Sequence, residues 1–245
     1  GELATYLSGR YVSFLVMPFS FREMCEIRKV QPESATEEML LEYMEWGGMP
    51  QRFQLTDQEQ VKTFLRDVYD TIVLRDIVQR AGIRDVDVFN RLIEYLACNP
   101  SQTVSVKSIS DYFMSVERKI SRETIYNYLE NITASMIMRK VSRYDVRGKY
   151  ILTKMEKYYL TDTGLGRVRN SGFKLEMGAL LENIIYNELI VRGYDVYVGK
   201  TRKSEVDFVA VRGNEKEYYQ VAYYLYDQKV IDREFGAFRE IEDNY

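Results

Sequence analysis

The chain has 245 residues, of which 46% are hydrophobic and 29% charged, and its formal net charge is −3. This composition is typical of a globular protein and excludes a disordered chain, and the acidic total confines nucleic-acid binding to a local basic patch. Histidine is absent and the only cysteines are Cys25 and Cys98, which argues against a disulfide framework and a structural zinc site. The two thiols indicate a reducing compartment, so we expect a cytoplasmic protein.

The sequence also lacks a membrane-spanning segment and a phosphate-binding loop. No apolar run approaches the roughly 20 residues that span a bilayer, so no membrane association is expected. The sequence holds no GxxxxGK[ST] phosphate-binding loop, so the chain itself should bind no cofactor through that device. It opens on GELATYL, without an initiator Met and with a helical pattern already running, and it stops at IEDNY just past a helical segment. From these ends we expect a fragment of a longer protein.

Residues 1–80 are predicted to combine one strand with helices. Ser20 followed by Glu23 predicts a capped helix start, and the GGMP run at 47–50 predicts a hard stop. The expected elements, in order, are a helix end at 1–7, a strand at 11–17 covered on both faces, a helix from Ser20, a helix at 39–46 and an amphipathic helix at 56–80.

Residues 81–165 carry the element order of a winged helix-turn-helix domain. The expected elements are helices at 86–99, 104–116 and 121–138, then beta runs at 139–146 and 149–162 joined by a tight turn at Arg147 and Gly148. Between residues 115 and 160 there are ten basic and five acidic side chains. This local excess of positive charge, on an acidic chain, is the candidate nucleic-acid surface.

Specific side chains of this segment are predicted to contact DNA. Basic residues around the start of the helix at 121–138 and on the wing should meet phosphates, while two polar residues early in that helix should reach bases. The phosphate-binding candidates are Arg118, Lys119 and Arg122, which flank the start of the helix, and Arg143, Arg147 and Lys149 on the wing; the base-reading candidates are Tyr126 and Asn127. The alternative is a winged helix that docks a protein or acts as a spacer, with an ordinary solvated face.

Residues 166–245 are predicted to pack a helix over strands. The expected elements are a helix at 177–193, strands at 194–200, 205–211 and 218–225, and a helix at 232–243. Strand alternation puts Asp207 on the same face as Glu205, and the helix could bring Glu182 close to them. Two carboxylates with the amide oxygen of Gln220 could hold Mg²⁺ and orient a phosphodiester.

The pattern of a helix glutamate, then EVDF, resembles the restriction-endonuclease-like (PD-(D/E)xK) nucleases. The resemblance implies that Glu182 and Asp207 descend from metal ligands and that an acid and a lysine should follow on the next strand. Here that motif reads Gln220-Val221-Ala222, so the acid is an amide and the lysine a methyl group. We therefore expect a degenerate, non-catalytic site. Lys200, Lys203 or Lys216 could migrate into it, but their spacing gives no support.

LSGRY with PFSFREM, followed by a GG-x-P turn, resembles the last part of an AAA-type ATPase module. Over essentially all 245 residues the order matches such proteins, which continue into a helical lid, a winged helix and a C-terminal domain of unknown function with the EVDF signature. The resemblance implies ATP and Mg²⁺ for the whole protein, a truncated last domain and a nucleotide-sensing role for Arg10. An ordinary surface arginine is the alternative for Arg10.

The sequence thus predicts a mixed α/β protein of three parts: an ATPase remnant with a helical lid (1–80), a winged helix (81–165) and a restriction-endonuclease-like domain (166–245). We expect it to bind DNA or a protein partner without catalysis, and to form homo-oligomers through the ATPase half. The rival function is a metal-dependent nuclease acting through Glu182, Asp207 and Gln220. A third is a toxin–antitoxin-like or membrane-complex regulator that never touches nucleic acid.

Overall fold

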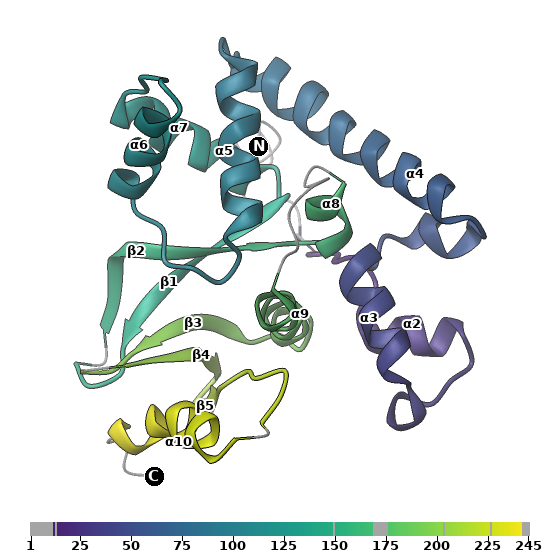
Figure 1. The fold of residues 1–245 in the computed structure, drawn as a ribbon, viewed down its shortest axis with the longest axis vertical. Helices are drawn as coiled ribbons and strands as arrows, with labels where there is room; N and C mark the ends of the chain where they lie inside the picture. Colours follow the sequence, from purple (N-terminus) through teal and green to yellow (C-terminus); the bar gives the residue numbers. More distant parts are fainter. Residues whose placement is uncertain are drawn as a thin grey trace.

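The computed structural model describes residues 12, 14–148, 150–168, 176–202, 204–225 and 227–241. A five-stranded sheet of order β2-β1-β3-β4-β5 crosses the centre of the molecule (Figure 1). The pair β1–β3 is parallel and the other neighbours are antiparallel, so the chain is a mixed α/β protein, as predicted. The strands are β1 (Met138–Asp145), β2 (Tyr150–Leu160), β3 (Asp195–Lys200), β4 (Glu205–Arg212) and β5 (Glu215–Tyr219).

Helices surround this sheet in three groups (Figure 1). Helices α5, α6 and α7 stand at one end, α2, α3 and α4 lie to one side, and α10 lies at the opposite end beside β5. The helices are α2 (Phe21–Ile27), α3 (Glu37–Trp46), α4 (Gln58–Asp70), α5 (Val86–Cys98), α6 (Val106–Ser115), α7 (Arg122–Ala134), α8 (Thr163–Arg167), α9 (Met177–Val191) and α10 (Gln228–Gly236), with 3-10 turns η1 (Pro32–Ser34), η2 (Pro50–Gln54) and η4 (Phe238–Glu240) and the π-helical η3 (Thr71–Gln79). No helix within the described ranges is long and apolar enough to cross a bilayer.

The helix starts and stops follow the local signals. Ser20 caps α2 in a capping box, because its hydroxyl accepts from the backbone N–H of Glu23 while the Glu23 carboxylate accepts from the N–H of Ser20 at 2.7 Å. Helix α3 ends at Gly47, whose φ of 70° lies in the left-handed region that glycine tolerates. The predicted long helix at 56–80 runs as α4 and continues without a break as η3.

The strand predicted at 11–17 is wrong for the residues that the structure describes. Residues 12 and 14–17 have no strand assignment, and Phe14 and Val16 are 84% and 86% exposed. An apolar run becomes a strand only where a neighbouring strand supplies backbone partners, and within the described ranges none lies beside this segment. The helix end predicted at 1–7 lies outside the described residues.

One sheet joins the segments that the sequence divides at residue 165. Strands β1 and β2 form the predicted hairpin, and β1 then pairs in parallel with β3 through Arg143–Val198, Tyr144–Gly199 and Asp145–Lys200. The predicted boundary between 81–165 and 166–245 is therefore bridged by main-chain hydrogen bonds.

The last predicted strand, 218–225, is shifted in the structure. Strand β5 begins at Glu215 and ends at Tyr219. Beyond it, side chains replace the ladder: Gln220 Oε1 accepts from the N–H of Asp207 at 3.3 Å, and Asp207 Oδ2 accepts from the N–H of Val221 at 2.7 Å. These bonds satisfy the backbone groups without a continued strand.

Helix α9 is tied to β2 by a buried amide. The Asn183 side chain is fully buried, accepts from the N–H of Leu160 at 2.9 Å and donates to its carbonyl at 2.7 Å. The rings of Tyr159, Tyr186 and Phe208 pack together beneath this contact. Because α9 is fixed in this register, the neighbouring Glu182 faces β2.

Candidate functional site: a buried carboxylate–lysine cluster and a basic groove

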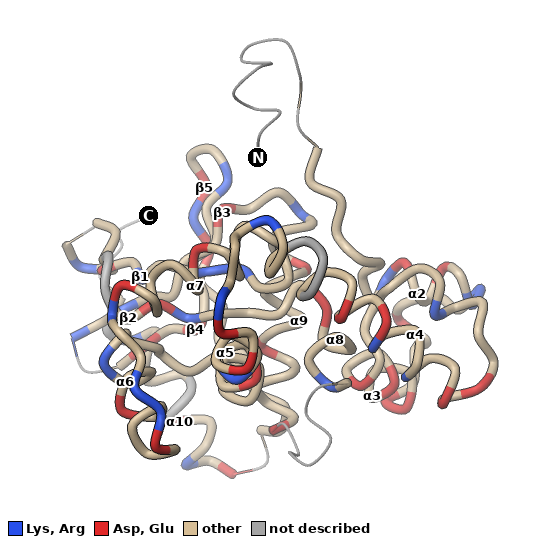
Figure 2. The backbone as a smooth tube through the Cα atoms, turned by 90° about the horizontal axis from the view of Figure 1, so that it is seen from above, with Lys and Arg blue, Asp and Glu red and all other residues tan. Residues whose placement is uncertain are grey.

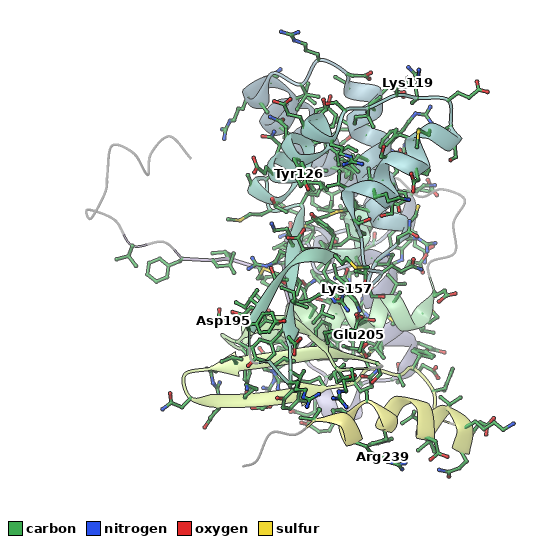
Figure 3. The ribbon with its side chains drawn as sticks, turned by 90° about the vertical axis from the view of Figure 1, so that its left-hand side faces the viewer. Lys119, Tyr126, Lys157, Asp195, Glu205 and Arg239 are labelled. Atoms are coloured by element: carbon green, nitrogen blue, oxygen red, sulfur yellow. The ribbon has the colours of Figure 1, made fainter. Side chains whose placement is uncertain are left out.

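A lysine from β2 lies between carboxylates of α9 and β4. Lys157 is 4% exposed, and its Nζ lies 2.7 Å from Glu205 Oε1 and 3.2 Å from Glu182 Oε1. Figure 3 shows Lys157 and Glu205 close together at mid-height. We name this group, with Tyr159 and Arg143, the Lys157 cluster. It connects the hairpin, α9 and β4 through charged side chains.

Two further side chains complete the cluster. The Tyr159 hydroxyl donates to Glu182 Oε1 at 2.6 Å, and Arg143 Nη2 donates to Glu205 Oε2 at 3.4 Å. The Arg143 side chain is 11% exposed, and its buried Nε has no hydrogen-bond partner within the described part of the chain. Arg143 was predicted to meet phosphate from the wing, but its guanidinium is turned into the cluster.

Burial and charge have opposite effects on the pKa of Lys157, but they act in the same direction on the pKa of Tyr159. Burial lowers the pKa of Lys157, but the carboxylates of Glu182 and Glu205 outweigh it and the pKa lies above its ordinary value. Burial, and then the charge of Glu182, hold the pKa of Tyr159 well above 10. Lys157 is therefore a cation and Tyr159 a neutral hydrogen-bond donor at neutral pH.

Asp207 lies beside this cluster, but its carboxylate is used differently. Its bond to the N–H of Val221 and the bond from its own N–H to Gln220 hold the chain that leaves β5. No group of three or more metal-ligating side chains is found within the described ranges. In this arrangement the Lys157 ammonium lies 3.2 Å from Glu182 Oε1 and the N–H of Val221 donates to Asp207 Oδ2, so both predicted metal ligands already have partners.

The cation of the cluster was not among the lysines considered for it. Lys216 instead donates to the Tyr144 hydroxyl at 3.3 Å and lies over that ring. Lys200 ends β3, and Lys203 lies outside the described residues. The one sequence signal for Lys157 is its position two residues before Tyr159, which puts both on one face of a strand.

Helix α7 presents a polar face to solvent. Arg122, Glu123, Tyr126, Asn127 and Glu130 are exposed, and Tyr126 is 59% exposed (Figure 3). Tyr126 and Asn127 therefore point outward, as predicted. The helix starts at Ser121, whose hydroxyl accepts from a backbone N–H of the first turn, so its first exposed turn is well defined.

The basic residues around the start of α7 differ in whether they have side-chain partners. Arg118 lies 3.4 Å from the carboxylate of Asp87. The side chains of Lys119 and Arg122 make no ion pair or hydrogen bond to any described residue. These two cations are therefore available to an outside ligand.

A groove of about 770 Å³ lies between α6, α7 and the hairpin. Its charged lining includes Lys107, paired with Asp111 at 2.8 Å, and Lys140, paired with Glu156 at 3.3 Å. Arg122, Tyr126 and Tyr158 also line it. Basic and acidic positions are interleaved over most of the described backbone (Figure 2). Positive charge is therefore not concentrated on one whole face, and the groove is a local feature.

The remaining predicted residues fall at the hairpin turn or outside the described ranges. Arg147 is exposed in the turn, where Asp145 Oδ1 accepts from the N–H of Gly148 at 2.7 Å. Lys149 and Arg10 lie outside the described residues. Their predicted roles, phosphate contact and nucleotide sensing, stay predictions.

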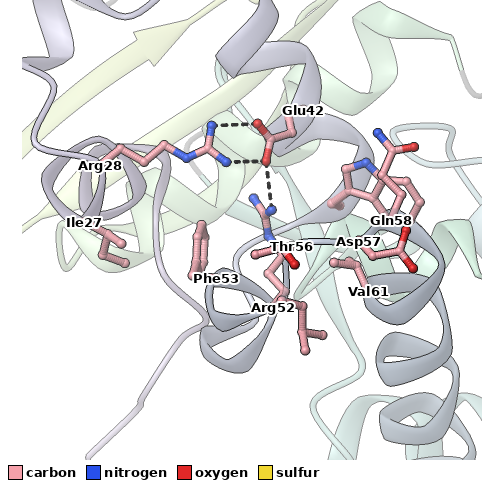
Figure 4. A pocket seen from close by; sticks show the side chains of 11 residues that line it. Ile27, Arg28, Glu42, Arg52, Phe53, Thr56, Asp57, Gln58 and Val61 are labelled. Carbon is pink, nitrogen blue, oxygen red and sulfur yellow. Dashed lines mark hydrogen bonds and ion pairs between the residues drawn. The ribbon is translucent and has the colours of Figure 1, made fainter.

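Sequence reasoning missed a second polar cluster, beside a pocket of about 410 Å³ (Figure 4). Arg52, only 4% exposed, donates to the carbonyl of Gly47 at 2.6 Å and to Glu42 at 3.2 Å, while Arg28 forms two bonds to Glu42. Burial raises the pKa of Glu42, but bonds from Arg28 and Arg52 outweigh it and the pKa is lowered. Arg52 thereby braces the glycine turn after α3.

Residues 37–173 match a family described as "Domain of unknown function (DUF8612)". The chain belongs to this family. The DUF8612 match runs from α3 to just beyond α8, so it includes the groove and Lys157, whereas Glu182, Glu205 and Asp207 lie beyond it.

Two curated relatives cover nearly the whole chain. An uncharacterised protein of Haemophilus influenzae is 36% identical over 246 residues, which are 100% of this chain and 60% of the relative. The uncharacterised protein MJ1544 of Methanocaldococcus jannaschii is 30% identical over 251 residues, 98% of this chain and 56% of the relative. The chain therefore spans less than two thirds of either relative. No solved structure matches it significantly.

Proposed function

We propose that this chain binds duplex DNA through the groove between α7 and the β1–β2 hairpin, without catalysing a reaction on it. The observation that carries the proposal is the solvent face of α7. Lys119 and Arg122 have no intramolecular side-chain partner within the described residues, and Tyr126 and Asn127 point outward beside them. Cations that meet phosphates next to polar side chains that reach bases are the two parts of specific DNA recognition.

The element order supports a winged helix around this groove. After α5, the N–H of Val104 donates to the carbonyl of Glu156 at 2.8 Å and forms an isolated antiparallel bridge with β2. Helices α6 and α7 and the hairpin follow. In a winged helix, the helix at the place of α7 enters the major groove and the hairpin flanks it.

Charge pairing inside the groove is compatible with DNA. Lys107 and Lys140 are 79% and 47% exposed, so their bonds to carboxylates are weak surface pairs. Each lysine can exchange its carboxylate for a phosphate at little cost, whereas the buried Lys157 cannot. Binding should therefore fall steeply with salt.

We propose that the C-terminal unit is a degenerate restriction-endonuclease-like domain. The order α9-β3-β4-β5-α10 and the placement of Glu182 near β4 support this, whereas Ala222 and the backbone bonds of Asp207 argue against catalysis. In the whole protein, we propose an AAA-type ATPase half that uses ATP and Mg²⁺, forms homo-oligomers and senses nucleotide through Arg10. A protein partner remains the alternative to DNA.

The test compares two charge-reversed variants with the parent chain. Lys119→Glu with Arg122→Glu changes the groove, and Arg22→Glu with Arg66→Glu makes the same charge change at exposed positions of α2 and α4. Binding to a labelled duplex is measured across a salt series. The groove variant should bind at least about ten-fold more weakly, with a salt slope smaller by about 2, while the control pair should bind like the parent. Equal binding by both variants would place the contact elsewhere.

A second candidate, metal-dependent cleavage of phosphodiesters, is favoured by one observation. The nuclease motif expects a lysine at position 222, where this chain has alanine. Lys157 instead places a cation beside Glu182 and Glu205. A metal ion would first have to displace the ammonium from a carboxylate. Incubation of duplex and single-stranded DNA with Mg²⁺ or Mn²⁺ tests it: cleavage that Asp207→Ala abolishes supports a nuclease, and intact DNA supports the binding function.

A further inference from the structure

Two turns far apart in the sequence meet at one end of the sheet. Parallel strands leave a sheet at the same edge, and the parallel pairing of β1 with β3 ends at Asp145 and Lys200. The N–H of Val146 then donates to the carbonyl of Lys200 at 3.0 Å. The β1–β2 turn, with Arg147, therefore lies directly beside the β3–β4 connection, with Arg202.

Three cations at this end have no side-chain partner among the residues that the structure describes. Arg147 and Arg202 are exposed and Lys200 is half-buried, and none of their side chains forms an ion pair or hydrogen bond with a described residue. A group of three unpaired cations is therefore a local site of positive potential.

Two carboxylates at this end already have partners. Glu205, the cross-strand neighbour of Lys200, bonds both Lys157 and Arg143. The side chain of Asp145 accepts from the N–H of Gly148 within its own turn. The internal cations thus neutralise Glu205, which otherwise would attract Lys200.

We propose that Arg147, Lys200 and Arg202 form a second phosphate-binding surface, the sheet-end surface, for the same duplex DNA that the groove binds. This inference rests on the proposed function. It adds two residues from the C-terminal unit, Lys200 and Arg202, to an interface otherwise built from the helices and the hairpin. One DNA molecule would then contact both halves of the continuous sheet.

The position of the surface fits a single extended ligand. The β1–β2 turn lies on the same side of the molecule as α6 and α7, at the far end of the hairpin (Figure 1). The groove, which β1 and β2 also line, lies between α7 and this turn. A duplex laid along this side would meet Lys119 first, then the groove with Arg122, then the sheet-end surface.

The chemistry of the surface indicates backbone contact and not base reading. Arginine and lysine bind phosphate oxygens, and the short connection that carries them is closed by its own bonds, because Thr201 accepts from and donates to Ser204. Its contribution should therefore be the same for every DNA sequence and should be lost at high salt.

The experiment adds a third variant, Arg147→Glu with Arg202→Glu, to the groove and control pairs already described. All three pairs change the charge equally and at exposed positions, so folding should be unaffected, and circular dichroism with thermal unfolding checks this. Duplexes of several sequences are titrated across a salt series. The sheet-end variant should bind at least about ten-fold more weakly at low salt, equally for each sequence, with a salt slope smaller by about 2.

The outcomes separate this inference from the proposed function. If the groove variant loses binding and the sheet-end variant binds like the control, the DNA-binding function stands and this inference fails. If the parent binds no DNA at low salt, the proposed function fails and the inference with it. A sheet-end variant that loses single-stranded RNA or an acidic polypeptide as readily as duplex DNA would also overturn it, because the surface would then be a non-specific anion binder.

Discussion

At the scale of single residues, the position of Lys157 decides how the acidic side chains of the C-terminal unit behave. Glu182 is 12% exposed and Glu205 is 28% exposed, and each carries a negative charge that the interior alone would not tolerate. The ammonium between them, together with Arg143 and the Tyr159 hydroxyl, supplies the compensating charge and hydrogen bonds. A buried pair of this kind costs more to break than its presence contributes.

Lys157→Met should therefore lower the free energy of unfolding by about 3 kcal/mol, because it leaves the Glu182 carboxylate without a cation and Glu205 with Arg143 alone. Urea unfolding at neutral pH measures the loss.

Lys140→Met is the matched control, because Lys140 also pairs with a glutamate from a strand but is 47% exposed. It should cost less than about 1 kcal/mol. If the two variants are equally stable, the Lys157 cluster is solvated and the cation is not needed for folding.

At the scale of elements, the glycine turn after α3 determines how α2, α3 and α8 meet. Gly48 accepts from the N–H of Phe19 at 2.9 Å and donates its own N–H to the Asp162 carboxylate at 2.7 Å. A Cβ atom at Gly48 would overlap the carbonyl oxygen of Phe19. The turn thus needs glycine for close backbone approach, and not only to end a helix.

Gly48→Ala should destabilise the chain by about 2–3 kcal/mol, because the backbone of Phe19 must move and weaken both bonds of the turn. Thermal unfolding measures this. In α9, a Cβ added at Gly178 meets no atom within 4 Å, so Gly178→Ala should be neutral or slightly stabilising. Similar losses in both variants would show that the close approach at Gly48 is not what limits the turn.

At the scale of the whole molecule, Asp162 joins parts of the chain that are distant in sequence. It is 3% exposed, caps α8 by accepting from the N–H of Leu165, and holds Gly48 from 114 residues earlier. Burial raises the pKa of Asp162 to about 6, although the backbone donors Gly48 and Leu165 act in the opposite direction. Between about pH 4 and 6, the folded chain therefore binds a proton at Asp162 that the unfolded chain, with an aspartate pKa near 3.8, does not bind.

The free energy of unfolding should consequently rise as the pH falls from about 6 toward 4, relative to Asp162→Asn, by up to about 1.4 kcal/mol per pH unit. The sign follows from the raised pKa: protonation stabilises the folded state within this window, and the contribution disappears above it. Unfolding of both chains across a pH series measures the difference. A difference that is constant between pH 4 and 7 would show that Asp162 stays ionised in the folded chain.

Much of the local structure was predictable from short patterns. Ser20 with Glu23 marked the start of α2, Ser121 marked that of α7, and Arg147 with Gly148 marked the turn of the hairpin. The outward direction of Tyr126 and Asn127 also followed from helical periodicity. Caps, turns and helical periodicity depend on residues that are close together in the chain, so they can be predicted from short stretches of sequence.

The failures have a different origin. The apolar pattern of residues 11–17 indicates that these side chains favour burial. It does not indicate whether another strand lies beside them. The end of β5 at Tyr219 depends on Asp207, a residue of another strand. To predict either feature, one must know which segment lies beside it in space, and a short stretch of sequence does not contain that information.

The sequence by itself determined the order of the main helices and strands after residue 20, the exposed polar face of α7, and the placement of Glu182 on a helix and Asp207 on a strand of one unit. Only the tertiary structure decided that β1 pairs with β3, and hence that Arg147 lies beside Arg202. It also decided that Lys157, one of the ten basic residues between 115 and 160, is buried against Glu182 and Glu205. The physical reason is that these contacts arise from sheet register and from charge burial, which only the packed chain fixes.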